Sequence, residues 1–100
     1  MTITKVNNDN QIIIRLEGWL DVETTVELAK YMGELEATKD LVFDFEKLEY
    51  ISSSGVREVI ASYKRQKEAE GVFKVINVNP EVMDVFSMTG LDKKLNIIAK

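Results

Sequence analysis

The alternation of apolar and polar positions along the chain predicts four or five strands. Residues 2–7 alternate in side-chain type, and residues 11–17 are rich in β-branched side chains. Asn and Asp residues separate these two segments, which predicts a hairpin of two strands. Residues 41–45 form a short apolar run typical of a strand buried on both faces, and residues 72–78 predict a further strand. Residues 95–98 fit either an edge strand or a docked tail.

Helical periodicity fills the segments between these strands. Asp21 can cap a first helix over residues 22–36. Its apolar side chains recur at helical spacing: Val22, Val26, Ala29, Met32 and Leu35. A second helix follows residues 52–55, with apolar positions at Val56, Val59, Ile60 and Tyr63. Its charged positions are expected to face solvent: Arg57, Glu58, Lys64, Arg65 and Lys67. A short third helix opens at Asn79 and Pro80 and ends near Gly90.

The order of these elements predicts an α/β fold. Strand-helix-strand alternation favours parallel pairing, so the hairpin adds an antiparallel strand to an otherwise parallel sheet. We expect one domain over residues 1–100, with a mixed sheet of four to five strands and three to four helices packed mainly on one face. Ligands of such sheets bind where strands lead into helices at their carboxyl ends. Here those loops are residues 18–21 and 52–55.

The composition of the chain predicts a packed core and argues against several classes of function. Leu, Ile, Val and Phe together make up 32 of the 100 residues, enough for a packed core. The net charge of −4 argues against binding to nucleic acid or to anionic lipid. The longest apolar runs are a few residues, far below the ~20 needed to span a bilayer, so we expect a soluble, cytoplasmic protein without membrane insertion.

The absence of Cys and His argues against an enzyme. It removes thiol nucleophiles, the histidine general base and the usual zinc and haem ligands. Ile51 also stands where a serine hydrolase's nucleophile elbow would carry glycine. We therefore expect no catalytic residue, no metal site and no cofactor.

Four features of the two loops and the neighbouring strand are candidates for function, and each has a structural alternative. Ser52, Ser53 and Ser54 lie before the second helix, where a hydroxyl can cap it and its dipole favours an anion. Asp21 is an N-cap that can also face a partner. Trp19 is either an interface anchor or a core side chain at the end of the sheet. Asp44 fits acceptance of backbone hydrogen bonds better than metal binding.

Four short motifs, in this order and spacing, resemble the STAS domain family. They are Gly18-Trp19-Leu20-Asp21, the strand at 41–45 with its acid Asp44, Tyr50-Ile51-Ser52-Ser53-Ser54-Gly55-Val56, and Met88-Thr89-Gly90-Leu91. The chain is most similar to the stand-alone anti-sigma factor antagonists of bacterial partner-switching pathways. The resemblance covers nearly the whole chain.

The resemblance implies a phosphorylation switch that regulates sigma-factor-dependent transcription. The unmodified antagonist binds an anti-sigma factor that is also a serine kinase, phosphorylation of one serine breaks the complex, and a PP2C-type phosphatase resets it. The family's motif, Asp-Ser-Ser-Gly, maps the modified serine onto Ser53. Trp19, Asp21, Ser52, Ser54 and Gly55 are then expected at the partner interface. The sequence departs from the motif at Ser52, where members usually carry aspartate, so three adjacent hydroxyls compete as acceptors.

That departure leaves a second interpretation open. A constitutive STAS scaffold, such as a subunit of a transporter or signalling complex, would use the serine loop only for docking. This alternative predicts no phosphoserine in the native protein.

Overall fold

The computed structural model describes residues 1–35 and 40–100 and contains one five-stranded sheet. The strands are β1 (Thr2–Asn8), β2 (Gln11–Leu20), β3 (Asp40–Ile51), β4 (Val72–Val78) and β5 (Ile97–Ala99). The helices are α1 (Val22–Gly33), α2 (Ser53–Glu68), α3 (Pro80–Met88) and α4 (Leu91–Lys94). In the sheet the strands follow their order in the chain; β1 is antiparallel to β2, and the remaining neighbours are parallel. The predicted mixed α/β architecture is confirmed.

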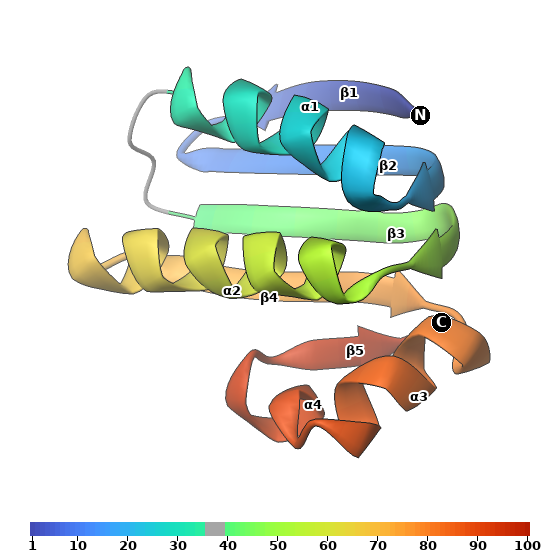
Figure 1. The fold of residues 1–100 in the computed structure, drawn as a ribbon. Coiled ribbons are helices and arrows are strands. Elements are labelled where there is room, and N and C mark those ends of the chain that lie inside the picture. Colours follow the sequence, from blue (N-terminus) through green and yellow to red (C-terminus); the bar gives the residue numbers. More distant parts are fainter. Residues whose placement is uncertain (36–39) are drawn as a thin grey trace.

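The helices lie against one face of the sheet, and the core fills the space between them (Figure 1). Phe43, fully buried on β3, packs against Phe45 and Phe73 with ring centroids 5.8 Å away in each case. The rings of Tyr63 on α2 and Phe73 meet edge to face at 5.7 Å. These aromatic contacts fix α2 above β3 and β4, and so place the start of α2 at the carboxyl end of the sheet.

Two strands are longer than predicted, and this matters for the site. β2 continues past residue 17 to Leu20, and β3 continues past residue 45 to Ile51 instead of entering a loop. Register shifts between Arg15 and Glu17 and between Gly18 and Trp19 allow β3 to accommodate extra residues while it stays paired with β2. Such bulges break the two-residue period, which is why the pattern of side chains ended the strand too early.

The apolar face predicted for α1 is confirmed at Met32 and wrong at Val22 and Val26. Met32 is buried together with Leu28, whereas Val22 and Val26 are 64% and 69% exposed. Leu28 and Met32 lie one turn apart and bury more apolar area than the two valines, so they determine which side of α1 faces the sheet. The helix ends at Gly33; residue 36, to which it was predicted to extend, lies outside the described residues.

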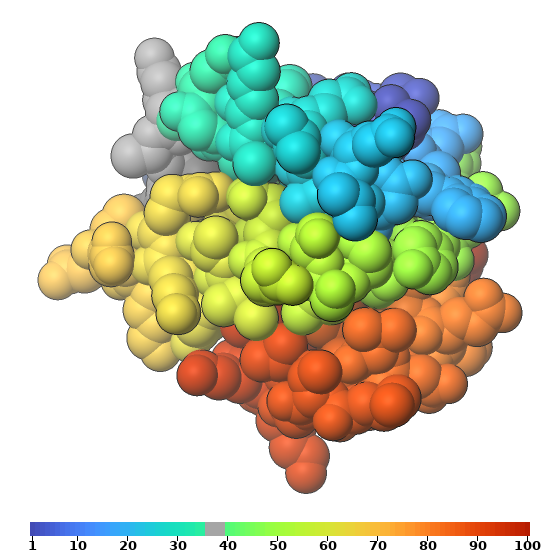
Figure 2. Space-filling view, in the orientation of Figure 1, coloured from blue at the N-terminus to red at the C-terminus, as the bar shows by residue number. Residues whose placement is uncertain are grey.

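Two further differences concern α2 and the C-terminal segment. The side chain of Glu58 is only 10% exposed, not solvated as expected, and accepts hydrogen bonds from Ser62 and Arg65. After α3, Gly90 with φ of 72° leads into the additional short helix α4. The last apolar segment is an edge strand, of which Ile97–Ala99 form β5, while Leu95 is buried in the core. Figure 2 shows the teal residues of α1, the yellow-green residues of α2 and the orange residues of the α3 region following one another across one face of the molecule.

Candidate functional site

The candidate site lies at the carboxyl ends of β2 and β3, where α1 and α2 begin. The backbone N–H of Ser52 donates to the carbonyl of Leu20 at 2.9 Å, which holds the two strand ends together. Gly18 has φ of 109°, a conformation open to glycine and strained for other residues, and it lies at the second register shift between β2 and β3. The loops named from the sequence therefore lie side by side at this edge (Figure 1).

Asp21 begins α1 through a reciprocal cap. Its carboxylate accepts from the backbone N–H of Thr24 at 3.0 Å, and the Thr24 hydroxyl oxygen accepts from the backbone N–H of Asp21 at 2.9 Å. The Thr24 hydroxyl lies 2.7 Å from the carbonyl oxygen of Trp19 and 3.0 Å from Oδ1 of Asp21, and its hydrogen is shared between these two acceptors. The hydrogen bond from the Thr24 backbone, followed by that from its side chain, lowers the pKa of Asp21 below 3.8. The cap thus fixes the entry to α1 and keeps a carboxylate at the site.

This cap predicts a specific dependence of stability on pH. Because folding lowers the pKa of Asp21, its carboxylate stabilises the fold above the unfolded pKa of 3.8, and this contribution disappears as the pH falls through the folded value. We therefore expect the stability deficit of the Asp21→Asn variant, relative to the wild type, to shrink as the pH falls from about 5 to about 2. Parallel urea titrations would measure it. A constant difference across that range would show that the carboxylate is not engaged.

The three serines before Gly55 differ in their surroundings. Ser52 is the N-cap of α2, half-buried, and its hydroxyl accepts from the backbone N–H of Gly55 at 3.1 Å. Ser53 is the first residue of the helix and is exposed, and its hydroxyl has no hydrogen-bond partner among the described residues. Ser54 is half-buried. Of the three hydroxyls, that of Ser53 is thus the one both accessible and uncommitted.

Ser52 performs the capping role that an aspartate would fill at the same position. The cap is retained, and the negative charge of an aspartate is absent. The first turn of α2 contains no acidic residue, so the partial positive charge of the helix start is not neutralised there. The arrangement is compatible with a phosphate on the neighbouring Ser53.

Gly55 is buried against the end of the sheet. A Cβ at this position would come within 2.8 Å of Cγ1 of Ile51 and 2.9 Å of Cγ of Leu20. The close approach brings the start of α2 down onto the two strands. Gly55 is consequently a packing residue beneath the serines, and it contributes little accessible surface of its own.

Trp19 and Tyr50 form an exposed aromatic pair beside the serines. They are register partners on β2 and β3, their ring centroids are 5.2 Å apart, and the rings are tilted by 41°. Trp19 is 57% exposed and Tyr50 is 44% exposed. Of the two roles open for Trp19, a core side chain is excluded by this exposure. Rigid aromatic side chains exposed together are typical anchors of protein interfaces.

Asp44 is a nearly buried acid on the face of the sheet opposite the helices. Its carboxylate accepts from the backbone N–H of Glu46 at 3.1 Å, from Nδ2 of Asn77 at 3.0 Å and from Nε of Arg15 at 3.3 Å. The structural interpretation of Asp44 therefore holds. Within the described parts of the chain, no cluster of acidic side chains could hold a metal ion.

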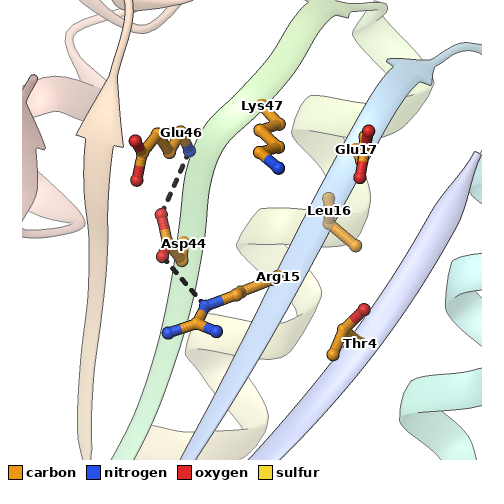
Figure 3. Close-up of a pocket in the computed structure, with 7 residues that line it drawn as sticks. All are labelled: Thr4, Arg15, Leu16, Glu17, Asp44, Glu46 and Lys47. Carbon is orange, nitrogen blue, oxygen red and sulfur yellow. Dashed lines mark hydrogen bonds and ion pairs between the residues drawn. The ribbon is translucent and has the colours of Figure 1, made fainter.

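A cavity of about 310 Å³ adjoins Asp44 on the same face (Figure 3). It is lined by Thr4, Arg15, Leu16, Glu17, Asp44, Glu46 and Lys47. Sequence reasoning missed this groove. The alternation of Arg15 and Glu17 along β2 was a usable signal, but the bulges of β3 concealed which of its residues share that face.

Comparison with known proteins identifies the family. The STAS domain profile matches residues 2–100. The chain belongs to the STAS domain family. A relative from Paenibacillus polymyxa, an anti-sigma F factor antagonist, is 30% identical over 89 residues, which cover 86% of this chain and 76% of the relative.

Solved structures share the fold of this STAS domain. An anti-sigma factor antagonist from Mycobacterium paratuberculosis superposes with a TM-score of 0.90 at 24% identity, over 99% of this chain and 86% of that one. The Bacillus cell fate determinant SpoIIAA in its phosphorylated form gives a TM-score of 0.78 at 22% identity, over 99% and 92% of the two chains. Across residues 1–35 and 40–100, no helix is long and apolar enough to cross a membrane.

Proposed function

We propose that this STAS domain is an anti-sigma factor antagonist regulated by phosphorylation of Ser53. The exposed, unpartnered hydroxyl of Ser53 at the start of α2 carries the proposal. A relative 30% identical to the chain is an anti-sigma F factor antagonist, and a protein of the same fold has been solved in a phosphorylated form. The partner is an anti-sigma factor with serine kinase activity in the cytoplasm, a PP2C-type phosphatase reverses the modification, and the domain itself catalyses nothing.

The proposed switch follows from charge. Phosphate adds about −1.5 to −2 charge and three acceptor oxygens at Ser53. The start of α2 tolerates this charge because its backbone N–H groups and dipole favour an anion. A partner packed on the unmodified loop would instead meet a desolvated dianion. Phosphorylation therefore opposes the complex and spares the fold.

The direct test is phosphorylation by the partner. We expect the anti-sigma factor kinase from the same genome, supplied with ATP, to place one phosphate per chain on Ser53, located by peptide mass spectrometry. The Ser53→Ala variant serves as the matched control. Absence of phosphate, or phosphate on Ser52 or Ser54 in place of Ser53, would refute the assignment and favour the constitutive scaffold.

Trp19 supplies a second prediction for the same interface. Truncation of an exposed aromatic anchor at an interface centre weakens binding by about thirtyfold or more. We expect this loss of affinity for the anti-sigma factor in Trp19→Ala, measured by calorimetry. Val72→Ala is the control, because Val72 is 55% exposed, close to the 57% of Trp19, and lies at the opposite end of the sheet. Equal affinities of the two variants would remove Trp19 from the interface.

A further inference from the structure

The helix-free side of β2 and β3 carries a continuous row of paired side chains. The register partners are Arg15 with Asp44, Glu17 with Lys47, and Trp19 with Tyr50. On β2 these residues are two apart, as on any flat strand; on β3 they are three apart, because each bulge inserts one residue. The two bulges thus bring Lys47 and Tyr50 onto the same face as the β2 residues.

The groove in this row holds two cations with free donors. Asp44, whose side chain is 10% exposed, fixes the guanidinium of Arg15 through Nε, and the terminal nitrogens of Arg15 have no hydrogen-bond or ion-pair partner among the described residues. Lys47 is exposed and likewise lacks such a partner in the described chain. In Figure 3 the Lys47 side chain lies over the groove between β3 and β2. Glu17, Asp44 and Glu46 also line the groove. The Asp44 carboxylate is already engaged by Arg15, Asn77 and the Glu46 backbone, so the free nitrogens of Lys47 and Arg15 are the groups available to a further carboxylate.

The groove also continues into the proposed interface. Trp19 lies two residues beyond Glu17 on β2, about 6 to 7 Å along the strand, and Tyr50 is its register partner on β3. Tyr50 is in turn two residues before Ser52. An extended segment that presents an acidic side chain to the groove would therefore present the side chain two residues away to the aromatic pair.

We propose that the anti-sigma factor reaches over the edge of the sheet onto this helix-free face. The partner segment is extended and carries an acidic residue and an apolar residue two positions apart. The acidic side chain pairs with Lys47 and the terminal nitrogens of Arg15, and the apolar side chain packs on Trp19 and Tyr50. This inference rests on the proposed function, since the groove joins the surface around Ser53. A second copy of this chain is the alternative occupant.

Charge reversal in the groove tests the proposal. We expect Lys47→Glu to weaken binding of the anti-sigma factor by about tenfold, with most of that difference lost at high salt. Lys64→Glu on the exposed side of α2 changes the net charge equally and is expected to leave affinity within about twofold. Calorimetric titrations at low and high ionic strength measure both, and thermal melts verify that the variants are folded.

The outcomes separate this inference from the proposed function. If Ser53→Asp abolishes binding while Lys47→Glu behaves as Lys64→Glu does, the partner stops at the serine loop and the inference is wrong. If the wild type binds no anti-sigma factor, both proposals fail. Sedimentation of the isolated chain addresses the second copy: a dimer dissociated by Lys47→Glu would also overturn the inference, and we expect a monomer.

Discussion

The Ser53→Asp variant is expected to lose at least about 100-fold in affinity for the anti-sigma factor while it melts at or above the wild-type temperature. The affinity falls because a carboxylate replaces an exposed hydroxyl at the centre of the proposed interface, where it would be desolvated without a partner. The fold is retained because the hydroxyl makes no hydrogen bond within the described chain and an acid in the first turn of a helix is favourable. Calorimetry and thermal unfolding measure the two quantities on the same preparation.

Two variants control this experiment. Ser53→Ala removes the hydroxyl without adding charge, so it should bind about as tightly as the wild type. Ser53→Asn has nearly the size and shape of the aspartate but no charge, so it should retain most of the affinity that Ser53→Asp loses. Tight binding by Ser53→Asp would mean that the serine lies outside the interface. A large fall in its melting temperature would mean that the charge acts on the fold instead.

Gly55→Ala is expected to destabilise the domain by about 1 to 3 kcal/mol. The added Cβ would lie 2.8 Å from Ile51 and 2.9 Å from Leu20, at atoms close to the backbone of two buried residues, so α2 must move away from the strand ends. Because Ser53 lies on the same turn, affinity for the partner should fall as well. Urea unfolding gives the change in free energy.

Gly33→Ala is the matched control for this substitution. Gly33 is also helical, but a Cβ there would meet nothing within 4 Å. The same chemical change should therefore be neutral or stabilise by up to about 1 kcal/mol through helix propensity. If both variants shifted stability equally, helix propensity rather than packing would explain the effect. The close contact of Gly55 with Ile51 and Leu20 would then make no measurable contribution to stability.

The architecture was predictable because its strongest signals are local. Alternation indicated the hairpin, the i, i+3, i+4 spacing indicated α2, and Asn79 with Pro80 marked the start of α3, whose cap the structure contains. Long-range packing could not be read in the same way. Val22 and Val26 match the helical period as well as Leu28 does. Which of these residues are buried depends on which side of α1 packs against the sheet, and the sequence pattern does not specify that side.

The same distinction between local signals and long-range packing applies to the candidate site. Parallel strands meet at one edge, so Asp21 and Ser52 could be placed together from the order of elements alone. The exposure that separates Ser53 from its neighbours depends on where each side chain points in the first turn of α2. The groove at Lys47 depends on the first bulge in β3, which leaves no mark in the pattern of apolar residues.

The most direct test of the account follows a preformed complex of this domain with its anti-sigma factor kinase after ATP is added. Size-exclusion chromatography would record dissociation, and mass spectrometry would record phosphate on Ser53 in the same samples. The account predicts that the complex separates in step with phosphorylation and that the released domain keeps its melting temperature. A fully phosphorylated domain that remained bound, or one released only because it had unfolded, would contradict it.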